Sequence, residues 1–428
     1  MQKKQKSVVL VVDNPVRDLP SLIILASELI KRGMKVCLTP FYGVGNFVAR
    51  TNPNIVVLNY ARPNNINLIK KLKSKGIQVC VLDTEGGIFS NTGSENTYEK
   101  TVIKDSSVRG LISKYFVWGE KLYKLLRDKE IYTEDQLLLT GTPRFDTYSG
   151  KYKTFINGRK EHNYILITGS FPTVNSKFQS VEVESKMLIE KFNYEPEYVE
   201  RLVKNLTSGL RLYVEKVCEL AKTFPDVDIV YRPHPFEKDS YYDDKFRDYP
   251  NIKLIKEGVI AEWIYNAFAL IHFESSCALD AVLMNKPCFA FEFSKVAFNI
   301  EDIDAITDRF DDNWLDTVKA CLNGNYAEPE QVKTNKARVI RDILYKEDGN
   351  SASRIAAALD ELPINENTHA NKMVMEIVKP VIKSALGKYD TSKKYTVEDV
   401  TGIISRLNIV QQAVVKHSLG EFRNIEIK

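Results

Sequence analysis

Short apolar runs typical of buried β-strands alternate with helix-like segments along most of this chain of 428 residues. The first run is SVVLVVD at 7–13. The segment after it, PSLIILASELIKRG at 20–33, repeats apolar residues at helical spacing and stops at Gly33. Strands that are apolar along their whole length need helices on both faces of their sheet. The alternation therefore predicts an α/β fold built on parallel sheets.

The alternation occurs twice, which predicts two Rossmann-like domains. The first series fills residues 1–150, and the segment 147–163 then loses apolar periodicity and is typical of a linker. A second series begins with the strand-like run YILITGSF at 164–171 and fills residues 160–330. Each domain is long enough to bury a core of its own.

After about residue 330 the apolar spacing becomes mainly helical, and the last such stretch is VEDVTGIISRLNIVQQAVVKH at 397–417. We therefore expect residues 331–428 to form a helical C-terminal segment. Packing back onto the first domain is the common fate of such helices. The alternative is a peripheral contact with a membrane or an assembly complex, because the segment is rich in Lys and apolar residues.

Composition argues against a nucleic-acid-binding protein, a disulfide-bonded protein and a membrane-spanning protein. Lys and Arg number 60 against 56 Asp and Glu, and a net charge of +4 gives no support for nucleic-acid binding. The six cysteines include no C-x-x-C pair and are typical of reduced core residues. No stretch approaches the roughly 18 consecutive apolar residues of a membrane span. We therefore predict a cytoplasmic protein, with the inner face of the cytoplasmic membrane as the site of any peripheral contact.

Ligands of open parallel sheets bind beyond the carboxyl ends of the strands, so residues directly after predicted strands are the candidates for chemistry. In the first domain the segment DTEGG follows the run IQVCVL. Asp83 and Glu85 offer carboxylates for acid–base or nucleophilic work at a sugar carbon, and Gly86 lets the backbone approach a ligand. The alternative is a polar turn capped by Asp83. Arg17, after the first strand, is a candidate anchor for a ligand carboxylate.

In the second domain the segment YRPHP follows the run VDIV. Two prolines, of which Pro235 is the second, stiffen the backbone around His234. Arg232 adds a cation whose planar fork suits phosphate or carboxylate. A lone histidine is usually structural, but the stiff strand-end loop and the neighbouring cation favour a functional one.

Two further segments of the second domain could contact a phosphate. FESSCALDA runs from a strand into a helix, where Ser275 and Ser276 are candidate caps and the helix N-terminus favours an anion. Gly169 and Ser170 follow the first strand of this domain and could approach the same group, although a plain turn explains them equally well. No metal-binding or P-loop motif occurs, so the predicted reaction uses no metal or cofactor.

The pairs Glu85-Gly86, His234-Pro235 and Ser275-Ser276 follow the order of the motifs D/E-x-E-G, H-P and S-S. In this order the chain resembles bacterial sialyltransferases and Kdo transferases of the GT-B fold, including the group called surface carbohydrate biosynthesis proteins. The resemblance covers about residues 7–295. The pattern often has two adjacent acids, whereas Thr84 precedes Glu85 here, which leaves the identity of the catalytic carboxylate open.

The resemblance implies a GT-B enzyme that transfers Kdo from CMP-Kdo to a glycan or lipid-linked acceptor during capsule, O-antigen or lipopolysaccharide synthesis. It implies Glu85 as the catalytic carboxylate and His234 as the group that assists departure of CMP. Ser275 and Ser276 would bind the CMP phosphate. If a covalent sugar adduct forms, Asp83 and Asp146 are further candidate nucleophiles.

Two alternatives remain at this point. One is a GT-B transferase that uses a UDP-sugar or CDP-glycerol as donor. The other is a non-catalytic sugar-binding subunit of a polysaccharide assembly complex. The acceptor, the linkage, the stereochemical outcome and the oligomeric state have no sequence signal that we could identify.

Overall fold

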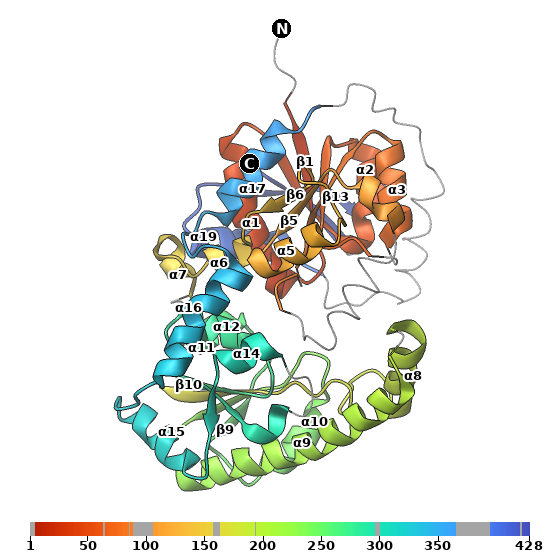
Figure 1. The fold of residues 1–428 in the computed structure, drawn as a ribbon. Helices are drawn as coiled ribbons and strands as arrows, with labels where there is room; N and C mark the ends of the chain where they lie inside the picture. Colours follow the sequence, from red (N-terminus) through yellow and green to blue (C-terminus); the bar gives the residue numbers. More distant parts are fainter. Residues whose placement is uncertain are drawn as a thin grey trace. The chain divides into compact units, whose positions relative to one another are not determined.

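The computed structural model describes residues 5–62, 65–84, 86–88, 106–156, 163–192, 194–295, 300–364, 394–419 and 422–428 (Figure 1). Glu85, the predicted catalytic carboxylate, lies outside these ranges. The chain divides into two compact units. The first comprises Met1–Gly87, Tyr98–Ile156 and Ile340–Lys428, and the second comprises Ile88–Thr97 and Asn157–Val339.

The first unit is built on a sheet with the strand order β13-β14-β2-β1-β3-β4-β5-β6. Strands β1 to β6 pair in parallel, as predicted, and Val8 to Val12 of β1 are almost completely buried. The parallel strands are β1 Ser7–Val12, β2 Lys35–Pro40, β3 Ile55–Leu58, β4 Gln78–Leu82, β5 Lys114–Val117 and β6 Leu137–Leu139.

Helices cover this sheet, and α1 is the most buried of the amphipathic ones. It begins at Pro15, where proline fits the first helical position, and the Asn14 side chain accepts a hydrogen bond from the Arg17 amide. Its apolar residues pack on β1 and β2, and the helix also contacts α6 and α17. The helices are α1 Pro15–Lys31, α2 Val44–Thr51, α3 Ile66–Ser74, α5 Glu120–Asp128, α6 Pro143–Asp146, α7 Lys153–Ile156, α17 Ser351–Glu361 and α19 Val397–Arg406.

The C-terminal end of the chain differs from the prediction. The helix expected over 397–417 ends at Arg406, and β13 Ala413–Leu419 and β14 Phe422–Ile427 then form an antiparallel hairpin. Strand β14 pairs with β2, and Ile425 and Ile427 are buried there. The hairpin covers an edge of the sheet that would otherwise leave backbone groups unpaired. This long-range pairing outweighs the helical spacing of the local sequence.

The second unit is built on a parallel sheet with the strand order β12-β11-β10-β7-β8-β9. These strands are β7 Tyr164–Thr168, β8 Ile229–Arg232, β9 Ile252–Leu254, β10 Ala267–His272, β11 Cys288–Phe291 and β12 Asp308–Phe310. The helices are α8 Val181–Phe192, α9 Pro196–Thr223, α10 Asp239–Phe246, α11 Ile260–Asn266, α12 Cys277–Leu283, α14 Glu301–Ala305 and α15 Trp314–Leu322, and α16 Glu330–Leu344 follows.

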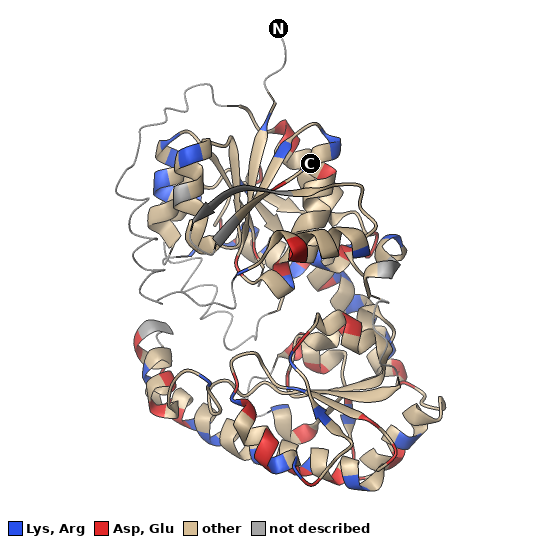
Figure 2. Ribbon diagram, turned by 180° about the vertical axis from the view of Figure 1, so that it is seen from behind, with Lys and Arg blue, Asp and Glu red and all other residues tan. Residues whose placement is uncertain are grey.

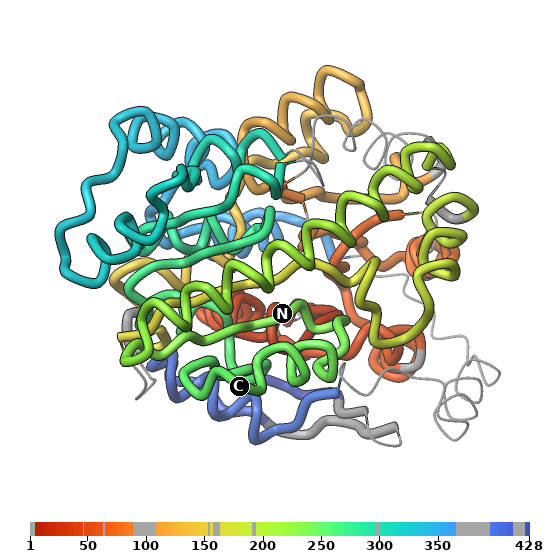
Figure 3. The backbone as a smooth tube through the Cα atoms, turned by 90° about the horizontal axis from the view of Figure 1, so that it is seen from below, coloured from red at the N-terminus to blue at the C-terminus, as the bar shows by residue number. Residues whose placement is uncertain are grey.

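The long helix α9 runs across the whole second unit (Figures 1 and 3). Its buried face includes Leu206 and Tyr213, which join Phe171 and Phe273 in the aromatic core of this unit. Basic and acidic residues are interspersed on its outer face (Figure 2), with ion pairs such as that of Arg211 with Glu215. Within the described part of the chain, no helix is both long and apolar enough to cross a membrane.

The C-terminal hairpin yields a stability prediction. Ile425→Ala should lower the free energy of unfolding by about 2–5 kcal/mol, because it leaves a cavity where the Ile425 side chain is buried. Val410→Ala is the matched control, since Val410 is 97% exposed and should change stability little. Urea unfolding of the full chain measures both. Equal stability of the two variants would contradict the role assigned to the hairpin.

Candidate functional site

Each sheet contains a point at which the strand order reverses. In the first sheet β2 and β3 lie on opposite sides of β1, and in the second sheet β8 and β10 lie on opposite sides of β7. The loops that leave such a point at the carboxyl ends of the strands diverge, and ligands of open α/β sheets bind there. The described candidates at these edges are Arg17, Asp83 and Gly86 in the first unit, and Gly169, Ser170, Arg232, His234, Pro235, Ser275 and Ser276 in the second.

Glu237, which the sequence analysis did not single out, connects two of the second unit's loops. Its Oε1 accepts hydrogen bonds from the amide of Phe171, after β7, at 3.0 Å and from the amide of His234, after β8, at 2.9 Å. The Tyr242 hydroxyl donates to Oε2. The side chain is fully buried, and burial raises the pKa of this carboxyl. A carboxylate three residues after His234 was the available signal, but its distant partner Phe171 was not visible in the sequence.

The His234 ring is held in one tautomer. Its Nδ1 accepts a hydrogen bond from the Phe236 amide at 3.2 Å, so the neutral ring carries its proton on Nε2. Burial, aided by the charge of Lys256, lowers the pKa of His234 to about 4. At neutral pH this side chain is therefore a neutral N–H donor. Such a donor can bind a phosphate oxygen but has little capacity to deliver a proton as imidazolium.

Arg232 supports the neighbouring loop. Its guanidinium donates hydrogen bonds to the carbonyls of Lys256, Glu257 and Gly258, at 2.5 Å for Glu257, and lies over the Trp263 ring. These contacts hold the segment between β9 and α11 against β8. The predicted contact of Arg232 with a donor phosphate stays a prediction.

Close packing shapes the loop after β7. Gly169 donates its amide to the Arg232 carbonyl at 3.1 Å, and a Cβ at this position would lie 2.8 Å from the Tyr231 hydroxyl oxygen. Glycine is therefore needed for the loop to approach β8. Ser170 follows Gly169 and is half-buried, while the hydroxyl of Thr168, which precedes Gly169, is buried without a hydrogen-bond partner.

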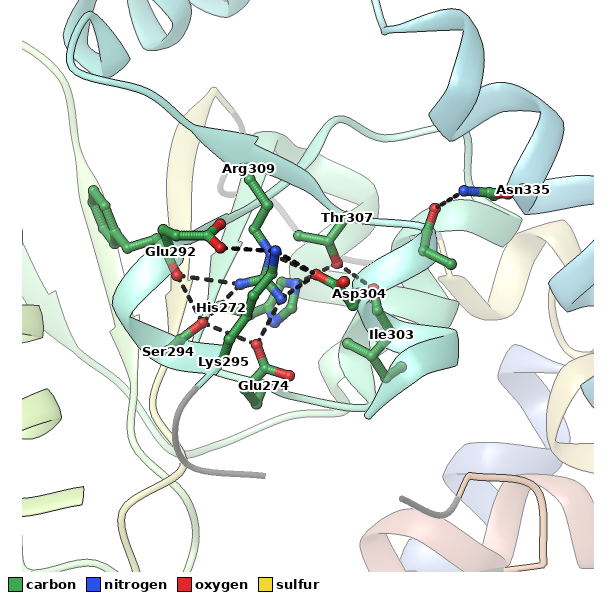
Figure 4. A network of polar contacts seen from close by, with 12 residues as sticks. His272, Glu274, Glu292, Ser294, Lys295, Ile303, Asp304, Thr307, Arg309 and Asn335 are labelled. Atoms are coloured by element: carbon green, nitrogen blue, oxygen red, sulfur yellow. Dashed lines mark hydrogen bonds and ion pairs between the residues drawn. The ribbon is translucent and has the colours of Figure 1, made fainter. Parts of the chain in front are cut away.

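A second histidine, His272, is fully buried and fixes the turn that contains the serine pair. His272 Nδ1 accepts a hydrogen bond from the Ser275 amide at 3.1 Å, which leaves the proton on Nε2. That nitrogen lies 3.0 Å from the Thr307 hydroxyl, which itself donates to the Ile303 carbonyl (Figure 4). Burial, with Arg309 nearby, lowers the pKa of His272 to about 3.

Between His272 and the serines, Glu274 adopts a left-handed backbone conformation with φ of 44°. Its Oε1 accepts hydrogen bonds from Arg309 at 2.8 Å and from the Ser294 hydroxyl at 2.9 Å, and Arg309 also pairs with Asp304 (Figure 4). Left-handed backbone is costly for a side chain other than glycine, so these contacts hold the residue there. This network ties the loops after β10, β11 and α14 together.

The serines themselves lie at the start of α12. Ser275 Oγ accepts a hydrogen bond from the Cys277 amide at 3.3 Å, as a capping residue does, and the exposed Ser276 makes no side-chain cap bond. Pro235 is also exposed. Phosphate binding by these residues stays a prediction.

In the first unit Asp83 is buried and part of the framework. The Tyr115 hydroxyl donates to its Oδ2 at 2.7 Å, the Arg62 guanidinium lies 3.8 Å from Oδ1, and Trp118 Nε1 donates to its backbone carbonyl. Gly86 is buried next in the same loop, and a Cβ on Gly87 would lie 2.0 Å from the Trp118 ring. The loop after β4 is therefore packed on Trp118. Nucleophilic chemistry at Asp83 stays a prediction.

Arg17 connects the loops after β1 and β4. Its Nε donates to Asp18 at 2.7 Å and its Nη2 donates to the Thr84 hydroxyl at 3.1 Å.

Within the described residues, no group of three or more His, Cys, Asp and Glu side chains is placed to hold a metal ion.

Asp146 has a structural role in this fold. Its buried carboxylate accepts hydrogen bonds from the amides of Ser351 at 3.1 Å and Ala352 at 2.8 Å, the first residues of α17. Because both oxygens are directed at this helix N-terminus, the geometry favours capping over the nucleophilic role considered from the sequence.

No protein-family model matches the chain, and a comparison with curated proteins found no match. Among solved structures, a Methanocaldococcus jannaschii UDP-GlcNAc 2-epimerase in complex with UDP-GlcNAc and UDP is 14% identical, covers 83% of this chain and 99% of its own, and has a TM-score of 0.51. A Neisseria meningitidis UDP-GlcNAc 2-epimerase bound to UDP-GlcNAc is 13% identical, with coverage of 84% and 100% and a TM-score of 0.50.

The wall teichoic acid polymerase TagF, in a structure with CDPG, is also 13% identical, with coverage of 84% and 88% and a TM-score of 0.50. At these identities the likeness concerns the fold. The chain has the GT-B fold. The two Rossmann-like sheets predicted from the sequence are thereby confirmed, and the C-terminal region contains helices as expected.

The lowered pKa values of His234 and His272 predict a pH response. We expect the NMR signals of the His234 and His272 side chains to keep the pattern of a neutral ring protonated on Nε2 down to about pH 5. Nitrogen-15 spectra of the full chain, assigned with His234→Gln and His272→Gln, measure this. A His234 signal that titrates near its ordinary pKa would contradict the lowered pKa of this ring.

The lowered pKa of His234 also affects the free energy of unfolding. Because the unfolded chain binds a proton that the native His234 ring excludes, the free energy of unfolding should fall as the pH drops from about 6.5 toward 4. His234→Gln should make this part of the profile flatter. Urea unfolding at several pH values tests the difference between the two proteins.

The capping role of Asp146 yields a further prediction. Asp146→Ala should lower the free energy of unfolding by about 1–2 kcal/mol, because two amides of α17 lose their acceptor. Asp128→Ala, at an exposed position of α5 where the side chain pairs with its neighbour Arg127, is the control and should change stability little. Equal thermal stability of the two variants would argue against the cap.

Proposed function

We propose that this chain is a nucleotide-sugar-dependent transferase whose donor binds at the carboxyl edge of the second sheet. One observation carries the proposal. Glu237 ties the loops after β7 and β8 together beside the neutral His234, and His272 and Glu274 fix the loop after the neighbouring strand β10. This edge includes the point at which the strand order reverses, where such sheets bind ligands.

The chemistry of this edge suits a phosphate leaving group. A nucleotide departs as an anion, so its departure requires stabilisation of negative charge and no strong acid. The Nε2–H of His234 offers one fixed donor, and the hydroxyls of Ser275 and Ser276 offer adaptable ones. We assign the catalytic carboxylate to Glu85 on the strength of the motif order, with Asp83 as the alternative.

The finer proposal is that the donor is CMP-Kdo and the acceptor a glycan or lipid-linked glycan of a surface polysaccharide. It is supported by the order of the Glu85-Gly86, His234-Pro235 and Ser275-Ser276 pairs. A 2-keto sugar acid carries a carboxylate at its reacting carbon, which an arginine such as Arg17 or Arg232 can bind. We place the enzyme in the cytoplasm, with peripheral contact at the inner face of the cytoplasmic membrane.

A second candidate donor is CDP-glycerol or a UDP-sugar. This candidate is supported by the fold likeness to TagF, whose structure contains CDPG, and to epimerases that bind UDP-GlcNAc. An epimerase is distinguished from a transferase by its product, since it changes the sugar and needs no acceptor. A non-catalytic sugar-binding subunit would bind a sugar without turnover.

Nucleotide binding is the first test. Thermal unfolding of the full chain with CMP, CDP or UDP measures which nucleotide stabilises the native state, and the proposal expects the largest shift with CMP. A larger shift with CDP or UDP would replace CMP-Kdo by the second candidate. No shift with any of them would overturn the transferase proposal.

Turnover is the second test. We expect His234→Ala to lower the release of nucleotide from the stabilising donor by about 10²–10³-fold, as removal of a fixed donor to a developing anion does. Arg211→Ala, at an exposed site of α9 in the same unit, is the control and should leave the rate unchanged. A folded His234→Ala variant with the rate of the original protein would contradict the role of this side chain.

A further inference from the structure

We propose that the first unit carries a surface that binds membranes with anionic lipid headgroups, formed by the ends of helices α2 and α3. The inference goes beyond the transfer reaction, because this surface lies at the amino edge of the first sheet, whereas Arg17 and Asp83 follow strands at the carboxyl edge. Binding to a lipid surface requires no nucleotide, so it can be tested separately from the donor.

A long stretch of the first unit contains no acidic residue. Between Glu28 and Asp83 the sequence has nine Lys and Arg residues and no Asp or Glu. In the whole chain 56 acidic residues nearly balance 60 basic ones. The excess of positive charge is therefore a local property of this stretch.

The fold gathers five of these cations at one edge of the sheet. Helices α2 and α3 lie side by side in Figure 1, apart from α1 and α17. Helix α2 ends at Thr51, shortly before β3 begins, and α3 ends at Ser74, shortly before β4 begins. Because β3 and β4 run parallel to β1, both helix ends lie at the amino edge of the sheet. We call the cations at these ends the basic face: Arg50, Lys70, Lys71, Lys73 and Lys75.

Most of the basic face has no compensating charge in the described part of the chain. Arg50 and Lys70 are exposed, and Lys73 and Lys75 are half-buried. Among the described residues, no carboxylate forms an ion pair with any of these four side chains. Burial lowers the pKa of Lys75, as it does for an ammonium group that no nearby carboxylate supports. Figure 2 shows the basic residues of these two helices with no acidic residue among them.

Helix dipoles explain only part of this arrangement. The carbonyl end of a helix favours cations, and Arg50, Lys71 and Lys73 lie in the last turns of α2 and α3. The same dipoles would favour acidic residues in the first turns, yet neither helix has one there. The exclusion of acids therefore points to an anionic partner outside the protein.

A lipid surface fits this distribution of charge. Clusters of about four to eight Lys and Arg residues attract anionic membranes through many weak contributions, whereas a single small anion would contact only one or two of the cations. A net charge of +4 for the whole chain gives no support for a nucleic-acid partner. An anionic membrane also agrees with the lipid-linked acceptor considered above.

The C-terminal segment, which the sequence suggested for a peripheral contact, has a different character where it is described. Helix α19 has Glu398 and Asp399 in its first turn. Arg406, in its last turn, donates a hydrogen bond to the Phe155 carbonyl at 2.8 Å. The basic face is therefore the better match to anionic headgroups.

The test is co-sedimentation of the full chain with lipid vesicles in the absence of nucleotide. One set of vesicles contains phosphatidylcholine alone, and the other also contains about 30 mol% phosphatidylglycerol. We expect binding to the anionic vesicles only. This binding should weaken by about tenfold or more when the salt concentration rises from about 0.05 M to 0.5 M, because salt screens the attraction. Equal binding to both sets, or no binding to the anionic set, would overturn the proposal.

A triple variant localises the surface. Lys70→Gln, Lys73→Gln and Lys75→Gln together should weaken binding to the anionic vesicles by about tenfold or more, since each cation near the membrane adds to the attraction. Circular dichroism confirms that the variant is folded. A folded variant that binds as tightly as the original protein would contradict the basic face.

The matched control removes the same charge from the second unit. Lys186→Gln, Lys253→Gln and Lys333→Gln change exposed lysines that pair with carboxylates, and together they should alter vesicle binding little. Equal losses in the two triple variants would mean that only the net charge matters, which would overturn the assignment to α2 and α3.

A DNA duplex of about 20 base pairs represents the other class of polyanion. Tighter binding to this duplex than to the anionic vesicles, at equal concentrations of negative charge, would assign the surface to nucleic acid and overturn the proposal. Failure of the donor proposal is a separate result, because it appears as the absence of a nucleotide-induced thermal shift and leaves vesicle binding unchanged.

Discussion

The buried carboxylate of Glu237 is the interaction on which the second unit's candidate site depends. It accepts amides from the loops after β7 and β8 and a hydroxyl from Tyr242 in α10. A buried carboxyl group without such donors would be too costly to keep, so the three partners and the side chain hold one another in place. The backbone of His234 is fixed by this carboxylate, and its ring is fixed in turn by the amide of Phe236. The neutral donor that we assign to the departing phosphate is therefore positioned by the loop framework.

In the first unit a buried carboxylate likewise joins two loops at the point where the strand order reverses. Asp18 binds the amides of Asp13 and Asn14 after β1 and the side chain of Asn59 after β3. In both units a buried acid connects loops that the parallel sheet brings to one edge but does not itself join. The two units differ in the polar group that each offers to a ligand. The second unit presents a histidine N–H donor, whereas in the first unit the side-chain oxygen of Asn59 is buried without a hydrogen-bond partner.

Several charged residues that the sequence suggested for catalysis or ligand binding have structural partners in the fold. Arg232 binds three carbonyls of the segment 256–258, and Asp146 binds the first amides of α17. Asp83 is buried against Tyr115 and Arg62. Strand-end positions are rich in such residues because loops at the edge of a sheet need buried polar anchors as well as ligand contacts. The position of a residue after a strand therefore shows that it lies at the carboxyl edge of the sheet. Its contacts in the structure are needed to show whether it supports the loops or can bind a ligand.

The sequence by itself determined the two α/β sheets and the edge of each that carries candidates, with Arg17 and Asp83 in the first unit and His234 and Ser275 in the second. Continuous apolar strands and helical spacing are local patterns, and residues directly after the parallel strands of one sheet must share an edge. It did not reveal Glu237, Glu274, Asp18 or Asn59, each of which has a hydrogen-bond partner distant in the chain. Nor did it reveal the C-terminal hairpin, because the pairing of β14 with β2 joins residues almost 400 positions apart. Only the tertiary structure decided which buried polar groups are satisfied, since that depends on partners brought together by folding.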